Sequence, residues 1–169
     1  NTTGNQNTAV GNYALFTNTT AAGNTAVGER ALRLNTAANN TAVGSAALAA
    51  NTTGGTNTAI GRKSLEDNTT GQDNVALGYA ALETNTTAAN NTAVGSYALN
   101  ANTTGACNVA VGGKSLYKNT TGGCNTATGT LSLYCNSTGS FNTASGYRAL
   151  VANTTASENT AVGYQALTA

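Results

Sequence analysis

The chain is an array of one short repeat, and this repetition constrains its fold more than any other feature. Aligned on a recurring Gly, the 169 residues form ten copies of N-T-T-G-x-x-N-T-A-V-G-x-x-A-L-x-x. Nine copies have 17 residues, and the third copy, 35–50, has lost one residue from its first half. A unit this small cannot bury a core alone, so the copies must stack and pair their backbones from one to the next.

Variation among the copies separates the inside of the stack from the outside. Five repeat positions never vary: the first and seventh Asn, the ninth Ala, the eleventh Gly and the fifteenth Leu. The tenth is mostly Val, with Ile60, Leu77, Thr128 and Ser145 as exceptions. All charged residues fall at the sixth, twelfth, thirteenth, sixteenth or seventeenth position. We therefore expect these five positions to face solvent, and the Ala-Val and Ala-Leu pairs to face packed surfaces.

The pattern predicts a β-solenoid of ten coils over residues 1–169, a single continuous array within a longer fibre. The N-T-A-V segment predicts one short parallel strand per coil, with a rise of about 4.8 Å per coil. The x-x-A-L-x-x segment predicts a helical or 3-10 turn, which places both Ala and Leu inward. The alternative is an all-strand β-roll, in which Ala and Leu would lie on opposite faces.

The invariant columns carry specific expectations. Stacked Asn side chains predict two hydrogen-bonded ladders along the coil corners. Asn35 supports a structural role for the first Asn, because it is kept in N-T-A, which is no glycosylation sequon. A Gly constant in every copy predicts a positive φ or a close backbone approach. We expect the ninth-position Ala column to be tightly packed and the Leu column to be the most buried.

Composition excludes several function classes. The net charge is +1 with 8% charged residues, which gives no basic stripe for nucleic acid. No stretch approaches the length of a membrane span, and no signal-peptide pattern is present. The chain has no His, so Ser-His and Cys-His pairs and His-containing metal sites are excluded. We predict no catalytic residue, no cofactor and no metal site.

Asn-linked glycosylation is one candidate modification. Sequons occupy the first repeat position of nine copies, at Asn1, Asn18, Asn51, Asn68, Asn85, Asn102, Asn119, Asn136 and Asn153. Two further sequons begin at Asn39 and Asn90. These sites could form a column of glycans along a fibre. Alternatively N-T-T is a turn sequence, and a ladder Asn that points inward cannot carry a sugar.

Cys and Tyr residues supply the remaining candidates. Cys107 and Cys124 share the sixth position of consecutive copies, which predicts a disulfide between coils, with two free thiols as the alternative. Cys135, at the seventeenth position, has no stacked partner. Tyr residues at the twelfth or thirteenth position either stack on sugars or cover a groove between coils: Tyr13, Tyr79, Tyr97, Tyr147 and Tyr164.

Copies such as N-T-A-V-G-Y-Q-A-L, residues 159–167, resemble repeats of bacterial and phage surface fibres, often labelled tail-fibre-like. This resemblance covers the whole chain. The small residues and Gly are also similar to the A-x-G-x-x-S repeats of trimeric autotransporter adhesin heads, although the period differs. The resemblance implies an extracellular structural or adhesive element on a cell or virion surface, often oligomeric, and it implies no catalytic residues.

The predicted function is therefore a non-catalytic segment of an extracellular repeat filament. The alternatives are a sugar-binding adhesin stalk and an ice-binding solenoid with regular Thr columns. The first and last copies, 1–17 and 153–169, are near-consensus and carry no cap. We therefore expect end-to-end stacking onto further copies, in the same longer chain or between chains. Lateral association is a second expectation, and glycans are further candidate partners.

Overall fold

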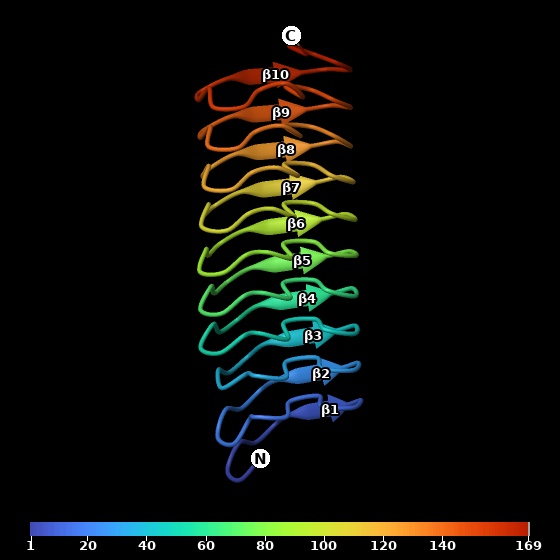
Figure 1. Ribbon diagram of the computed structural model, residues 1–169, viewed down its shortest axis with the longest axis vertical. Helices are drawn as coiled ribbons and strands as arrows, with labels where there is room; N and C mark the ends of the chain where they lie inside the picture. Colours follow the sequence, from blue (N-terminus) through green and yellow to red (C-terminus); the bar gives the residue numbers. More distant parts are fainter. Residues whose placement is uncertain (169) are drawn as a thin grey trace.

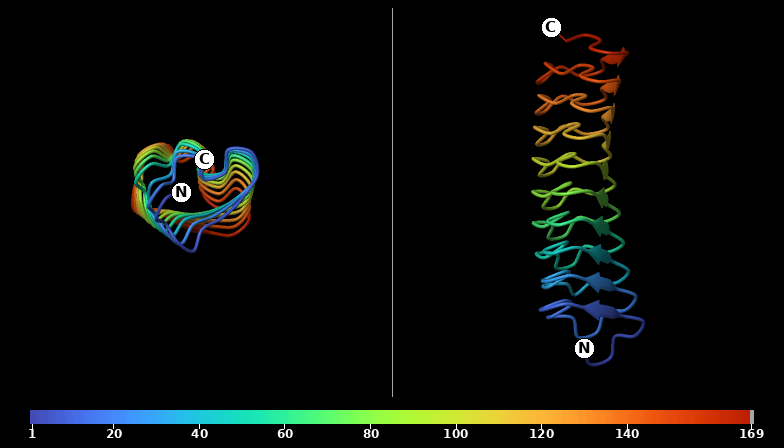
Figure 2. Two further views of the ribbon diagram at one scale, coloured as in Figure 1. Left: turned by 90° about the horizontal axis from the view of Figure 1, so that it is seen from below. Right: turned by 90° about the vertical axis from the view of Figure 1, so that its right-hand side faces the viewer.

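The computed structural model describes residues 1–168, which form a rod of stacked coils (Figures 1 and 2). Each coil contributes one three-residue strand to a single parallel sheet in sequence order. The strands are β1 (Thr8–Val10), β2 (Thr25–Val27), β3 (Thr41–Val43), β4 (Thr58–Ile60), β5 (Val75–Leu77), β6 (Thr92–Val94), β7 (Val109–Val111), β8 (Thr126–Thr128), β9 (Thr143–Ser145) and β10 (Thr160–Val162). Equivalent repeat positions pair throughout, including the short copy, where Thr25 pairs with Thr41. The predicted parallel solenoid is confirmed.

The turn after the conserved Gly is not helical, and the expected helical or 3-10 turn is wrong. Residues 1–168 contain no helix, and so none that could span a membrane. In the second copy Arg30 and Leu32 have φ of 58° and 50°, on either side of Ala31, which is not among the positive-φ residues. The Arg30 N–H therefore donates to Asn12 O of the preceding coil at 2.8 Å, and the Leu32 N–H donates to Ala47 O of the following coil at 3.0 Å. A helix would instead send both N–H groups toward its own N-terminus.

The same turn rules out the all-strand alternative. Ala31 and Leu32 are both fully buried, whereas a strand would place adjacent side chains on opposite faces. Each coil also contains a single strand in the described residues rather than two or three. The alternating sign of φ is what turns two consecutive side chains to the same side.

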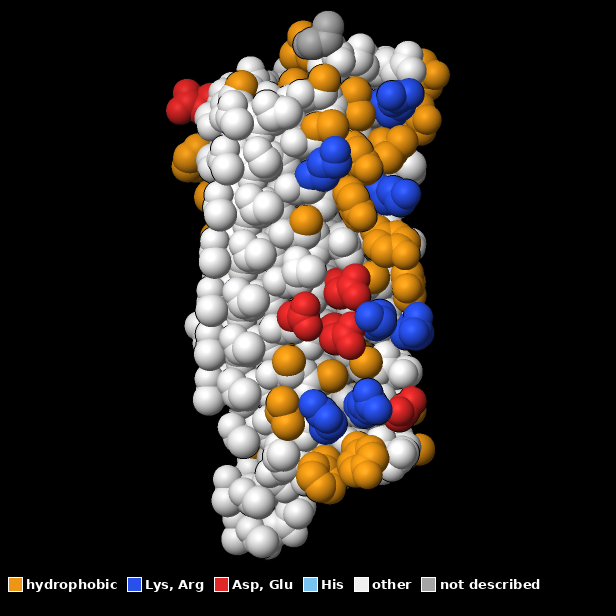
Figure 3. All heavy atoms as spheres, in the orientation of Figure 1, with side chains coloured by type: hydrophobic (Ala, Val, Ile, Leu, Met, Phe, Trp, Pro, Cys, Tyr) orange, Lys and Arg blue, Asp and Glu red, His pale blue; other side chains and the backbone are white. Residues whose placement is uncertain are grey.

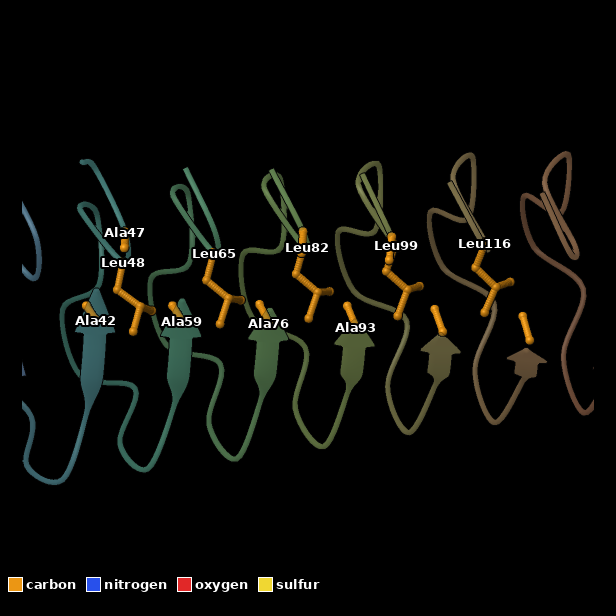
Figure 4. Close-up of a cluster of buried hydrophobic side chains, with 14 of the residues drawn as sticks. Ala42, Ala47, Leu48, Ala59, Leu65, Ala76, Leu82, Ala93, Leu99 and Leu116 are labelled. Atoms are coloured by element: carbon orange, nitrogen blue, oxygen red, sulfur yellow. The ribbon is translucent and has the colours of Figure 1, made fainter. Parts of the chain in front are cut away.

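A narrow core runs along the rod between the turn and the sheet. Figure 4 shows Leu side chains from the turns, such as Leu82 and Leu99, pointing toward strand residues such as Ala76 and Ala93. The Leu column is fully buried from Leu32 to Leu133, and the strand Ala column from Ala26 to Ala144. In these copies the Ala column is tightly packed and the Leu column fully buried, as predicted, but the Leu column is not the most buried one, because the Ala column is buried to the same extent. In the outermost copies Ala9 is exposed and Leu167 is 61% exposed.

The tenth-position Val column lies on the outer face of the sheet, so the expectation that the Ala-Val pair is packed is wrong. In β2 to β9 the central Ala is buried and its two neighbours are half-buried or exposed. Ile60 and Val111, for example, are 43% and 39% exposed. The cause is the two-residue period of a strand: once Ala points inward, the residues on either side of it point outward.

The eleventh-position Gly has both properties expected of it. Its φ lies between 119° and 137° in all ten copies, a region that residues with a Cβ rarely adopt. A Cβ added at Gly112 would lie 2.6 Å from the carbonyl carbon of Gly129 in the next coil. Adjacent coils therefore touch backbone to backbone at this column.

Axial hydrogen bonding extends beyond the strands into every bend of the coil. The Thr52 N–H donates to Thr69 O at 2.9 Å, and the Thr58 N–H to Asn74 O at 2.8 Å, both in the following coil. The Asp73 N–H donates in the other direction, to Gly55 O at 3.3 Å. Each coil thus presents a fixed set of donors and acceptors that matches the next copy.

Candidate functional site

The first-position Asn residues form a buried ladder, as predicted. From Asn51 to Asn153 each side-chain Nδ2 donates to Oδ1 of the preceding Asn, over seven links of 2.7–3.1 Å. The same Nδ2 also donates to the fourth-position carbonyl of its own coil, as from Asn102 to Gly105 O at 2.9 Å. Both amide protons are used, so these side chains brace the bend and join it to its neighbour.

The seventh-position Asn residues form a second ladder of a different kind. Here the backbone N–H of each Asn donates to Oδ1 of the Asn one coil earlier, as from Asn108 to Asn91 at 2.9 Å. The nine links run from Asn7 to Asn159 and continue through the short copy, where the Asn40 N–H bonds Asn24. Side-chain oxygens thus replace the carbonyls of a β-ladder at this corner.

We expect Asn102→Ala to lower the free energy of unfolding by about 1–3 kcal/mol, because it leaves buried amide groups without partners. The lost bonds are those with Asn85 Oδ1 and Gly105 O and the one accepted from Asn119 Nδ2. Urea denaturation measures the effect. Asn12→Ala is the control, since the Asn12 side chain is exposed and makes no hydrogen bond to residues 1–168. Equal losses in the two variants would contradict a stabilising ladder.

Burial excludes glycans from most of the predicted column. The side chains of Asn18, Asn51, Asn68, Asn85, Asn102, Asn119 and Asn136 are at most 1% exposed. Their Nδ2 atoms point into the rod as hydrogen-bond donors, so the glycan column expected at these residues is incompatible with the fold. Asn1 is exposed and Asn153 half-buried, while the two additional sequons begin at exposed Asn39 and Asn90.

Cys107 and Cys124 lie one coil apart on the surface as exposed free thiols, and Cys135 is a half-buried free thiol. The Cys124 N–H donates to Ala106 O at 3.0 Å, which stacks Cys124 next to Cys107. Equivalent residues in adjacent parallel coils are about 4.8 Å apart, within the Cα separation that a disulfide spans. The predicted disulfide between the two therefore stays a prediction, and the fold places its partners side by side.

Oxidised glutathione is expected to convert Cys107 and Cys124 to an intramolecular disulfide, releasing two molecules of reduced glutathione. Mass spectrometry of proteolytic fragments should find these two residues joined and Cys135 outside the bridge. The bridge restricts the unfolded chain and so raises the free energy of unfolding by about 3 kcal/mol. The melting temperature should therefore fall when a reductant is added. In Cys107→Ser the reductant should have no effect, and a reductant-sensitive melting temperature in that variant would contradict the pairing.

Aromatic and basic side chains gather on the turn side of the rod, visible along one edge of Figure 3. Tyr117 and Tyr134 stack with ring centroids 5.3 Å apart, and Tyr79 meets Tyr97 edge to face at 5.0 Å. The Lys114 Nζ lies 5.9 Å from the Tyr117 ring centroid, and Lys118 lies over Tyr134. We call the surface formed by the twelfth, thirteenth, sixteenth and seventeenth positions the turn face.

Sequence reasoning identified the Tyr residues at the twelfth and thirteenth positions but missed those at the sixteenth, Tyr117 and Tyr134. The alternating backbone of the turn brings the thirteenth and sixteenth positions into contact, as the edge-to-face pair of Tyr13 and Phe16 shows. The rings of the turn face largely pack on one another, which agrees with the groove-covering interpretation of the Tyr residues. No repeat-position signal in the sequence specified this contact.

Charges in the middle of the turn face form a network of ion pairs. The Lys63 Nζ lies 3.0 Å from Glu66 and 3.2 Å from Glu83, and hydrogen bonds to these two carboxylates raise its pKa. Burial and then the neighbouring charges of Glu66 and Glu83 raise the pKa of Asp67. In residues 1–168 no group of three His, Cys, Asp or Glu side chains is arranged to hold a metal ion. With Arg62 and Lys63 against Glu66, Asp67 and Glu83, this ion network has one more negative charge than positive.

Comparison with known proteins identifies no relative of this chain. No family model, curated protein or solved structure matches the chain.

Proposed function

We propose that the chain is a rigid, non-catalytic structural segment of an extracellular repeat fibre. The observation that supports this most is the uniformity of the coil interface. The strands, bends and seventh-position Asn residues make the same axial bonds at successive copies. A stack held together in this way gains length by adding copies without changing its cross-section. The resemblance of the N-T-A-V-G-x-x-A-L motif to surface-fibre repeats supports an extracellular location.

The partner that best fits a coil is another copy of the same coil. Donors at the second, eighth and fifteenth positions point toward the following coil, as at Thr52, Thr58 and Leu48. Donors at the sixth, eleventh and thirteenth positions point toward the preceding coil, as at Asp73, Gly61 and Lys63. The two edges of any coil are therefore complementary, and stacking can continue within a longer chain or between chains.

Cryo-electron microscopy of the intact assembly tests this proposal. We expect uniform rods with an axial repeat of about 4.8 Å or a multiple of it. A gene with the array 51–135 duplicated should give rods that are longer by the added copies and equal in width. Compact particles whose shape does not lengthen with copy number would refute the proposal. Labelling of intact cells or virions with an impermeant reagent tests the location, and protection from the reagent would contradict it.

Ice binding is a second candidate, favoured by the outer face of the sheet. Eight of the ten eighth-position residues are Thr, and the tenth-position column is mostly Val. Both columns point outward without a single charge and repeat at every coil. Regular hydroxyl and methyl groups on such a surface can order water.

A thermal-hysteresis assay decides between inert spacer and ice binder. Activity that is lost in Thr92→Arg, on the outer face, and kept in Thr87→Arg, in the exposed bend, would establish ice binding. The absence of hysteresis in the unmodified chain would eliminate this candidate and leave the structural proposal intact.

A further inference from the structure

The turn face contains a pocket of ≈ 450 Å³ between the first and second coils. Its lining residues are Tyr13, Phe16, Thr17, Arg30, Arg33 and Leu34. They come from the thirteenth, sixteenth and seventeenth positions of two consecutive copies, so the pocket lies on the turn face. Two cations and two aromatic rings from adjacent coils meet in it.

One wall of this pocket is aromatic and exposed. The Tyr13 and Phe16 rings meet edge to face, with centroids 5.2 Å apart and planes at 77°. Their side chains are 50% and 65% exposed, which makes Phe16 one of the most exposed large apolar residues of the rod. With Leu34, the rings offer an apolar surface to a flat ligand group.

The other wall carries guanidinium groups that the protein leaves poorly satisfied. Arg33 Nε is buried and has no hydrogen-bond partner among the described residues. Arg30 has a single acidic neighbour, Glu29, at 3.5 Å, and both side chains are more than half exposed. An exposed pair of this kind is weak and readily exchanged for another anion. Because Arg33 Nε is closed off from solvent, an incoming anion would contact the outer Nη groups of Arg33 instead.

Most other cations of the turn face already have partners. Lys63 is bonded to two carboxylates. Lys114 and Lys118 lie over Tyr rings, and Arg62 lies over the Tyr79 ring at 5.7 Å. Arg33 differs from these in lining the pocket without an ion pair or a stacked aromatic ring among residues 1–168.

We propose that this pocket binds a carboxylate carried on a sugar ring, as in a uronic acid unit of an acidic polysaccharide. The planar guanidinium of Arg33 matches a carboxylate and offers it the outer Nη groups. The C–H face of the pyranose packs on Phe16 and Tyr13. Inorganic anions have no apolar face to pack on the rings, and neutral sugars have no negative charge to bind the guanidinium groups. Each would therefore contact only one wall of the pocket. The pocket belongs to a single chain, so the inference does not depend on fibre assembly.

Fluorine NMR on the complete chain labelled with fluorophenylalanine tests the proposal. The chain has only two Phe residues, so Phe16 reports on the pocket and Phe141, on a different bend, is an internal reference. Glucuronate should shift the Phe16 signal saturably and leave the Phe141 signal unchanged. Glucose, which lacks the carboxylate, and phosphate, which lacks the ring, should bind at least about tenfold more weakly.

Variants separate the role of Arg33 from general charge. Arg33→Gln should weaken glucuronate binding about tenfold or more. Arg33→Lys should also weaken it, because lysine keeps the charge but lacks the planar group that donates two parallel hydrogen bonds. Arg148→Gln, which removes an exposed cation from the same repeat position as Arg30, should leave affinity within about twofold. Circular dichroism confirms that each variant is folded. The proposal would be overturned if the Phe16 signal showed no saturable shift, or if glucose or phosphate bound as tightly as glucuronate. It would also be overturned if benzoate bound more tightly than glucuronate, or if the Arg33 and Arg148 variants had equal effects.

Discussion

Replacing Gly112 by Ala should lower the free energy of unfolding by about 2–6 kcal/mol, the combined cost of backbone strain and overpacking. Gly112 has a φ of 136°, which disfavours any residue with a Cβ. The added Cβ would also lie 2.6 Å from the carbonyl carbon of Gly129. The coils cannot separate locally to relieve this contact without lengthening the axial bonds beside it.

The neighbouring Gly113 is a matched control. It has no positive φ, and a Cβ placed on it would have Ser96 O as its nearest neighbour, at 4.0 Å. Gly113→Ala should therefore leave stability unchanged or raise it by about 0.4–1 kcal/mol through the unfolded chain. Urea titrations of both variants measure the contrast. A loss in Gly113→Ala as large as that in Gly112→Ala would show that close coil contact is not the cause.

Leu133→Ala should destabilise the chain by about 2–5 kcal/mol, because it opens a cavity in a narrow core whose only large side chains are those of the Leu column. Leu133 is fully buried. Leu131→Ala is the control, since it is the same substitution two residues away, at a half-buried site on the turn face. Both residues have positive φ, 49° and 60°, so the change in backbone preference is shared. The control should lose less than about 1 kcal/mol.

Thermal unfolding followed by circular dichroism suits this pair, with Leu99→Ala as a repeat of the test in another coil. Leu99 has the same full burial and a φ of 50°. Similar losses at Leu99 and Leu133 are expected from equivalent coils. Equal losses at Leu131 and Leu133 would mean that the core column carries no special share of the stability.

The sequence correctly predicted the surroundings of the repeat positions at which only one residue type occurs. An invariant column indicated a contact that only one side chain can make. The structure has a close backbone approach at the Gly column, the core at the Ala and Leu columns, and hydrogen-bonded ladders at the Asn columns. The tenth position was misassigned although its variation held the information. A column that accepts Thr128 and Ser145 beside Val lies on the outer face, where polar and apolar residues are both tolerated.

The turn could not be predicted because local preference opposes it. Leu at φ near 50° is unfavourable for an L-residue by about 1–2 kcal/mol, and every coil contains one. A helical turn satisfies the same inward Ala-Leu pair without that cost. Only the axial bonds to coils before and after, such as Arg30 to Asn12 and Leu32 to Ala47, stabilise the alternating conformation. The pocket at Arg33 depends on this turn, so its position was equally hidden from the sequence.

In residues 1–168 the first-position Asn ladder has no link between the first and second coils or between the second and third, and the missing residue of the third copy lies at the second of these gaps. There Asn35 Nδ2 donates to Ala37 O within its own coil at 2.7 Å, and Asn18 Oδ1 is left buried without a partner. In a linear stack, strength under load is set by the weakest junction rather than by the average. Opening, proteolysis and amide exchange are fastest where a junction is weakest. We therefore expect the junction at this one-residue deletion to open before the junctions that the continuous Asn ladder joins, from the third coil to the tenth.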